Sequence, residues 1–245
     1  MTKNIFAQSL LAGMLLTSAL RLAVADNIPE TLFRAGDRVL FQGDSITDMA
    51  RGRTADPNHI LGHGYVFLIA AKYGSSFPQN NVVFLNRGIS GDKVSDLSRR
   101  WKSDTVDLKP DVLSILVGVN DLNGNVSAEQ FEQQYNELLQ QTVKELPNVH
   151  LILCEPFGLP VGKKTENWDA YHAELLKRQA IVAKLADKYH APLVHFQKAL
   201  DDACKRAPAD FWIWDGVHPT YSGHQILADE WARTVREANW NSSRS

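Results

Sequence analysis

The sequence predicts an α/β fold: a three-layer α/β/α sandwich around a central, mainly parallel sheet of five strands. Three observations predict it. Short apolar runs alternate with longer stretches of helical periodicity, the runs are apolar throughout rather than alternating, and turn formers follow them. Strands of that kind are buried on both faces, as in parallel sheets covered by helices. The predicted strands are 38–41, 82–85, 112–117, 150–153 and 192–196.

Helical patterns fill the intervals between these strands. A helix over 64–73 is closed by Gly74, and the next carries Val94, Leu97 and Trp101 on one face. Ser127 and Gln130 form a capping-box pattern ahead of the following helix. The periodicity further predicts a helix over about 168–189 and a terminal helix through residue 231.

Residues 1–25 have the layout of a secretory signal peptide. Lys3 precedes an apolar run over 5–20, and Ala23-Val24-Ala25 supplies a small-x-small cleavage site before Asp26. A membrane anchor is disfavoured because the run is short and interrupted by polar residues. We therefore expect a secreted or periplasmic protein without stable membrane insertion, in which residues 26–245 form one domain.

Composition excludes several classes of partner. Of the 245 residues, 44% are hydrophobic and 22% are charged, and the formal net charge is -2. With no basic stripe, the sequence gives no reason to expect a nucleic-acid partner.

The sequence contains two cysteines, Cys154 and Cys204. Cys154 ends an apolar run and is expected to be a buried free thiol. The sequence leaves open whether they pair, and it leaves the oligomeric state open too. Without a CxxC or another metal-type cluster, we expect no cofactor and no metal.

Ser45 stands where the first predicted strand ends. The stretch Phe41-Gln42-Gly43-Asp44-Ser45 puts the serine at the carboxyl end of the strand, where open α/β sheets place their ligands. Gly43 permits a sharp turn there. On this stretch alone, a helix N-cap and a nucleophile are about equally consistent with the pattern.

Three further loops supply the partners that a nucleophilic serine needs. Asp215 and His218 are spaced so that a carboxylate can hold one imidazole nitrogen while the other faces Ser45. The backbone N–H groups of Ser45 and Gly91 and the side-chain amide of Asn120 are candidate oxyanion donors. Each has an ordinary alternative as a cap, a turn residue or a surface histidine.

In combination these stretches resemble the GDSL/SGNH hydrolases. The matching blocks are Gly43-Asp44-Ser45-Ile46, Ile89-Ser90-Gly91-Asp92, Gly118-Val119-Asn120-Asp121 and Asp215-Gly216-Val217-His218, within a resemblance over roughly 36–235. The resemblance implies a flavodoxin-like SGNH hydrolase fold, a nucleophile at Ser45, an Asp215–His218 pair and an oxyanion hole of Ser45, Gly91 and Asn120. Ile46 stands where the family name has leucine.

The implied activity is a serine esterase acting through an acyl-enzyme, on short acyl groups such as O-acetyl on carbohydrate. The segment around Asp215 resembles that of secreted acetylxylan-type esterases. Trp212 and Trp214, just ahead of it, are candidate substrate contacts, although such residues as often complete a core. The alternatives are a lysophospholipase, arylesterase or thioesterase of the same family, and a non-catalytic glycan-binding module.

Overall fold

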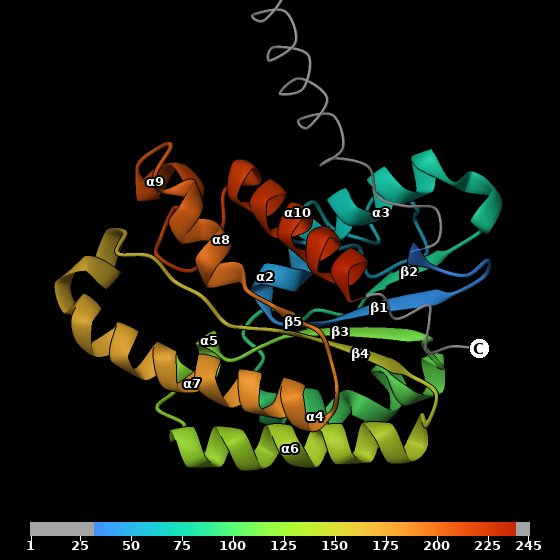
Figure 1. The fold of residues 1–245 in the computed structure, drawn as a ribbon, viewed down its shortest axis with the longest axis horizontal. Coiled ribbons are helices and arrows are strands. Elements are labelled where there is room, and N and C mark those ends of the chain that lie inside the picture. Colours follow the sequence, from blue (N-terminus) through green and yellow to red (C-terminus); the bar gives the residue numbers. More distant parts are fainter. Residues whose placement is uncertain (1–31, 239–245) are drawn as a thin grey trace, which may run out of the picture.

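The structure is a computed structural model that describes residues 32–238, with a parallel five-stranded sheet at its centre (Figure 1). The strand order is β2-β1-β3-β4-β5, and every neighbouring pair is parallel. This confirms the predicted α/β sandwich. The predicted signal peptide lies outside the described residues and stays a prediction. The strands are β1 (Arg38–Gly43), β2 (Val83–Asn86), β3 (Val112–Leu116), β4 (His150–Cys154) and β5 (Leu193–Val194).

Helices cover both faces of this sheet. Figure 1 shows α3, α8 and α10 on one face and α4, α6 and α7 on the other. Successive side chains of β1 point to opposite faces of the sheet. Val39 and Phe41 pack in the core beneath α3, α8 and α10, and Leu40 packs in the core beneath α4, α6 and α7. The α-helices are α2 (Ser45–Asp48), α3 (Tyr65–Ser76), α4 (Val94–Asp104), α5 (Val119–Asn123), α6 (Ala128–Glu145), α7 (Trp168–Lys188), α8 (Phe196–Ala203), α9 (Ala209–Trp212) and α10 (Tyr221–Glu237); the 3-10 helices are η2 (Pro78–Asn80), η3 (Val106–Leu108) and η4 (Gly162–Asn167).

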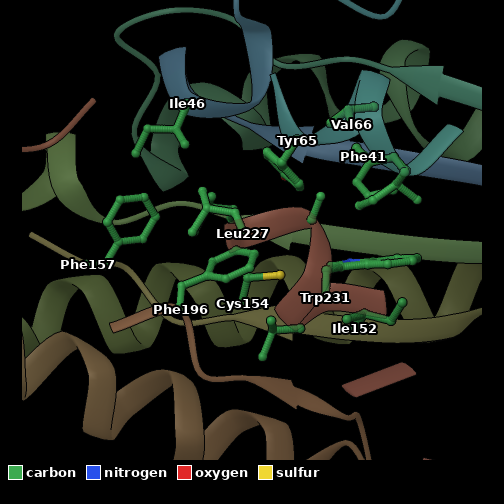
Figure 2. Close-up of a cluster of buried hydrophobic side chains, with 14 of the residues drawn as sticks. Phe41, Ile46, Tyr65, Val66, Ile152, Cys154, Phe157, Phe196, Leu227 and Trp231 are labelled. Atoms are coloured by element: carbon green, nitrogen blue, oxygen red, sulfur yellow. The ribbon is translucent and has the colours of Figure 1, made fainter. Parts of the chain in front are cut away.

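Trp231 anchors α10 to the sheet. Figure 2 shows it in one buried cluster with Phe41, Cys154 and Phe196. Its indole N–H donates to the Ser114 hydroxyl at 3.0 Å, so the one polar atom of the ring is satisfied inside the core. Truncating such a ring to alanine typically costs about 3–5 kcal/mol. The anchor matters for the site because α10 begins directly after the loop that carries His218.

Two predicted boundaries were wrong. The strand expected over 192–196 is only Leu193–Val194, because Phe196 opens α8, whose first turn is held by the N–H of Gln197 donating to Glu155. The helix expected to close at Gly74 runs to Ser76, where the following Phe77-Pro78 dipeptide disfavours further helix. Gly74 lies inside α3, whose C-cap is Phe77, so this glycine does not close the helix.

The two cysteines remain unpaired in the described chain. Within it, neither Cys154 nor Cys204 forms a disulfide, and Cys154 is fully buried, where burial raises the pKa of its thiol to about 12. The expected buried free thiol at Cys154 is therefore confirmed. Between residues 32 and 238, no helix is both long enough and apolar enough to cross a bilayer.

Candidate active site

Ser45 is the first residue of α2, immediately beyond the end of β1. Gly43 must lack a side chain, because a Cβ there would lie 2.3 Å from the carbonyl oxygen of Leu116 and 2.5 Å from Oγ1 of Thr47. The N-cap of α2 is Asp44, whose Oδ1 accepts from the N–H of Ile46 at 3.0 Å. The capping role that the sequence left open for Ser45 therefore belongs to its neighbour, and the Ser45 hydroxyl is available for other contacts.

A chain of hydrogen bonds joins Ser45 to His218 and Asp215. Ser45 Oγ lies 2.8 Å from His218 Nε2, and His218 Nδ1 lies 2.7 Å from Asp215 Oδ2. The other carboxylate oxygen, Asp215 Oδ1, accepts from the backbone N–H groups of Val217 at 3.0 Å and His218 at 2.8 Å. The structure thus brings together three residues that the sequence separates by up to 173 positions.

The hydrogen bonds to Asp215 determine its charge. Partial burial acts to raise the pKa of this carboxyl, but the backbone and side-chain hydrogen bonds from His218 outweigh it and lower the pKa below its ordinary value. An ionised Asp215 only accepts hydrogen bonds, so the facing His218 Nδ1 carries the proton. Nε2 of a neutral imidazole is then the acceptor that faces the Ser45 hydroxyl.

The three candidate oxyanion donors lie in loops or helix starts after β1, β2 and β3. Within residues 32–238, the backbone N–H groups of Ser45 and Gly91 have no acceptor. Gly91 is exposed, has a φ of 89°, and a Cβ there would meet no atom within 4 Å, so the space beside its Cα is open. Asn120, in α5, donates one amide hydrogen to the carbonyl of Asp92 at 3.1 Å and retains the other.

Asp44 is a buried acid beside the nucleophile that the sequence analysis passed over. Burial is the main cause that raises the pKa of Asp44 to about 7, with the carboxylates of Asp121 and Asp92 adding to it. Its Oδ2 has no hydrogen-bond partner among the described residues. In mildly acidic solution this carboxyl is therefore mainly neutral and places little negative charge next to Ser45.

The structure separates the two tryptophans considered as substrate contacts. Trp212 is buried in the core, with its indole N–H donating to the carbonyl of Ala207 at 3.2 Å. Trp214 is 66% exposed, and its ring centroid lies 6.3 Å from that of His218. Trp214 is therefore the more accessible of the two rings, and substrate contact at Trp212 and Trp214 stays a prediction.

Lys164 and Tyr171 also lie near the Asp215 segment. Lys164 Nζ sits 3.8 Å from the centre of the Tyr171 ring and donates to Asn123 Oδ1 at 2.7 Å. Burial lowers the pKa of Lys164, which the charge of Asp215 partly offsets. No spacing or pattern in the sequence predicts the hydrogen bond between Lys164 and Asn123, because it joins η4 to α5, about 40 residues earlier in the chain.

Comparison with known proteins decides the family. The model of the GDSL-like lipase/acylhydrolase family matches residues 41–226, which spans all four blocks of the site. The chain belongs to this family. As a GDSL-like hydrolase it is a carboxylic ester hydrolase, and the serine, glycine, asparagine and aspartate–histidine blocks lie within the matched region.

Relatives of this GDSL-like hydrolase span nearly its whole described length. The acetylxylan esterase of Geobacillus stearothermophilus is 29% identical over 213 residues, covering 82% of this chain and 94% of that protein. A crystal structure of that esterase matches with a TM-score of 0.73, over 83% of this chain and 96% of the other. A GDSL-like lipase from Parabacteroides merdae is 36% identical, with a TM-score of 0.79, over 83% and 97% of the two chains.

Metal ligands do not gather at this site. Over residues 32–238, no group of three or more His, Cys, Asp or Glu side chains is arranged to hold a metal ion. The two histidines nearest each other in sequence, His59 and His63, lie in a loop, where His59 Nδ1 contacts Asp56 Oδ2 at 2.6 Å.

Proposed function

We propose that this hydrolase is a serine esterase in which Ser45 is the nucleophile, His218 the general base and Asp215 the group that orients the imidazole. The observation that carries the proposal is the unbroken chain from Ser45 Oγ through the His218 ring to Asp215, at 2.8 and 2.7 Å. The solved relatives support it, because catalytic mutants of the Geobacillus acetylxylan esterase replace a serine, an aspartate and a histidine by alanine.

The geometry supports the following reaction. His218 Nε2 takes the Ser45 proton as Oγ attacks the ester carbonyl, and the resulting oxyanion accepts hydrogen bonds from the N–H groups of Ser45 and Gly91 and from Asn120. The C–O bond of the ester then breaks, and the alcohol leaves with the proton from His218. Water, deprotonated by the same imidazole, attacks the acyl-Ser45 carbonyl and releases the acid, which restores Ser45.

We infer that the substrate is a short-chain ester, an O-acetyl group on a carbohydrate. Two observations support this inference. The acetylxylan esterase relative is covered over 94% of its length, and the exposed Trp214 ring offers a flat apolar face beside His218. Such rings pack against the apolar faces of sugars while remaining partly wet.

Hydrolysis of p-nitrophenyl esters from acetate to palmitate tests the proposal, with wild type and Ser45→Ala measured side by side. We expect acetate to be cleaved fastest, turnover to fall with chain length, and Ser45→Ala to lose at least about a thousandfold in kcat. Acetylated xylooligosaccharides come next. A maximum at long chains would move the substrate to lipids, the class that the lipase relative from Parabacteroides merdae suggests. Unchanged turnover in Ser45→Ala would refute the serine mechanism.

A further inference from the structure

Asp48 links the helix that carries the nucleophile to the loop that carries Gly91. It is the last residue of α2, three positions after Ser45, and it is 3% exposed. Its Oδ2 accepts from the backbone N–H of Ser90 at 2.9 Å and from the Ser90 hydroxyl at 3.1 Å. Ser90 directly precedes Gly91, so the contact lies one residue from a proposed oxyanion donor.

Both oxygens of the Asp48 carboxylate accept hydrogen bonds, and all of them come from N–H or O–H groups. Besides the two groups of Ser90, Arg53 Nη2 donates to Oδ2 at 2.7 Å and Arg53 Nη1 to Oδ1 at 3.0 Å, while the N–H of Arg51 donates to Oδ1 at 3.2 Å. Burial acts to raise the pKa of Asp48, but the Arg53 and Ser90 hydrogen bonds outweigh it and hold the pKa below its ordinary value. The group therefore stays ionised in neutral and mildly acidic solution, as an acceptor-only contact set requires.

The start of the same loop is pressed against the α2 backbone. A Cβ at Gly88 would lie 2.4 Å from the Asp48 nitrogen, so only glycine allows this approach. The Gly88 carbonyl accepts from Arg51 Nε at 2.8 Å, and Asn86 Nδ2 donates to the Thr47 carbonyl at 2.7 Å. These contacts fix where the loop begins, but Gly88 and Asn86 are three and five residues away from Gly91.

Gly91 itself has no side chain to hold it, and its neighbours perform that task. On one side Ser90 is bound by Asp48, and on the other the Asp92 carbonyl accepts from Asn120 at 3.1 Å. The three proposed oxyanion donors are thus connected. Ser45 and Asp48 belong to the same helix, α2, and Asp48 is hydrogen-bonded to Ser90, the residue before Gly91. Asp92, the residue after Gly91, is hydrogen-bonded to Asn120. Displacing any link changes the direction of the Gly91 N–H relative to Ser45 Oγ.

We propose that Asp48 is a positioning residue for ester hydrolysis, which sets the Gly91 N–H against the nucleophile through its two bonds to Ser90. The proposal rests on the serine mechanism proposed above. The hydrogen bonds to the Asp48 carboxylate come from Ser90, Arg51 and Arg53, and none comes from Ser45 or His218. Its effect is expected on the stabilisation of the tetrahedral intermediate, where a displaced donor matters, and not on the binding of the uncharged ester.

Asp48→Asn tests the proposal, because it keeps the shape of the side chain but turns one acceptor oxygen into an NH₂ group that meets donors. On p-nitrophenyl acetate we expect kcat to fall on the order of tenfold or more, below the roughly hundredfold loss of a whole oxyanion donor, with KM within about twofold. Asp37→Asn is the matched control. Asp37 is also a buried carboxylate bonded to a backbone N–H, but it precedes β1 at the opposite edge of the sheet.

A second readout separates positioning from loss of stability. Phenylboronic acid adds to a serine hydroxyl as a tetrahedral adduct, so its inhibition constant should rise in Asp48→Asn by about the factor by which kcat/KM falls. If Asp48→Asn fails to fold, Ser90→Ala serves instead: it deletes one of the two bonds, and we expect a loss of about threefold in kcat and an equal weakening of boronate binding.

Two results would overturn the inference: wild-type kcat and boronate affinity in a folded Asp48→Asn or Ser90→Ala, or an equal loss in Asp37→Asn. Ser45→Ala keeps this separate from the proposed function. An inactive Ser45→Ala beside a fully active Asp48→Asn refutes only the role of Asp48, whereas an active Ser45→Ala refutes the serine mechanism on which it depends.

Discussion

The buried contacts of Asp48, in the helix that begins at Ser45, and the exposed aromatic residues that follow α8 are built in opposite ways. In the first region, Asp48 is 3% exposed and both of its carboxylate oxygens are hydrogen-bonded. In the second, which comprises Phe211, Trp214 and Tyr221, the side chains are 50%, 66% and 85% exposed. We refer to these three residues as the aromatic segment.

The difference indicates a division of labour. Groups that stabilise a transition state must be held in position before the reaction, and buried, fully bonded side chains provide this. Groups that recognise varied substrates tolerate movement, and exposed rings at helix ends and in the turn between α9 and α10 suit that task. Substitutions near Ser45 should therefore act on kcat, and substitutions in the aromatic segment should act on KM for large substrates.

Asp215→Asn should give the larger effect. Asparagine can still accept the backbone N–H groups of Val217 and His218 through one oxygen, so the turn should survive. Its NH₂ group, however, faces His218 Nδ1 and favours the tautomer whose Nε2 cannot take the Ser45 proton, which costs about 10⁴-fold in kcat where it has been measured in serine proteases. We expect a fall of about a thousandfold or more on p-nitrophenyl acetate.

The pH profile sharpens this prediction. The bonds to His218 hold the pKa of Asp215 below its ordinary value of 3.8, so the carboxylate is ionised at neutral and mildly acidic pH. Wild-type turnover should therefore show no loss from Asp215 protonation in that range. A loss smaller than about tenfold in Asp215→Asn would show that the carboxylate is not required to orient His218.

Trp214→Ala should give the smaller effect. Removing the exposed ring deletes one stacking surface worth about 0.5–1.5 kcal/mol, which corresponds to a KM for acetylated xylooligosaccharides that rises about two- to tenfold. Turnover of p-nitrophenyl acetate should stay within about twofold. The control is Leu176→Ala, because Leu176 is a half-exposed apolar residue on a different element, α7. Equal losses on both substrates in Trp214→Ala would place the ring in the chemistry instead.

Most of the fold and the Ser45, Asp215 and His218 arrangement could be predicted from the sequence. For the strands and for Ser45 the reason is topological: uniformly apolar runs separated by helices predict parallel strands, and the carboxyl ends of parallel strands meet at one edge. Asp215 and His218 lie between α9 and α10, and their spacing and the family resemblance grouped them with Ser45. Residues that follow strands can therefore be grouped at that edge from the order of the strands alone. This held for Ser45, which follows β1, and for Asn120, which follows β3.

The remainder depends on packing that short motifs do not encode. Trp212 and Trp214 are two positions apart and equally apolar, yet one is in the core and the other in solvent, because Trp212 ends α9 against the core while Trp214 lies in the turn beyond it. The role proposed for Asp48 depends on the close packing of residues 88–90 against α2, which are about 40 residues apart in the sequence.

Labelling with a fluorophosphonate tests the central claim most directly. The Ser45 oxygen should attack phosphorus, expel fluoride and leave a stable adduct, which peptide mass spectrometry would locate on Ser45, while esterase activity falls in step with labelling. Ser45→Ala should neither be labelled at this peptide nor hydrolyse p-nitrophenyl acetate. Full labelling at another serine, or activity that persists after Ser45 is fully modified, would contradict the account.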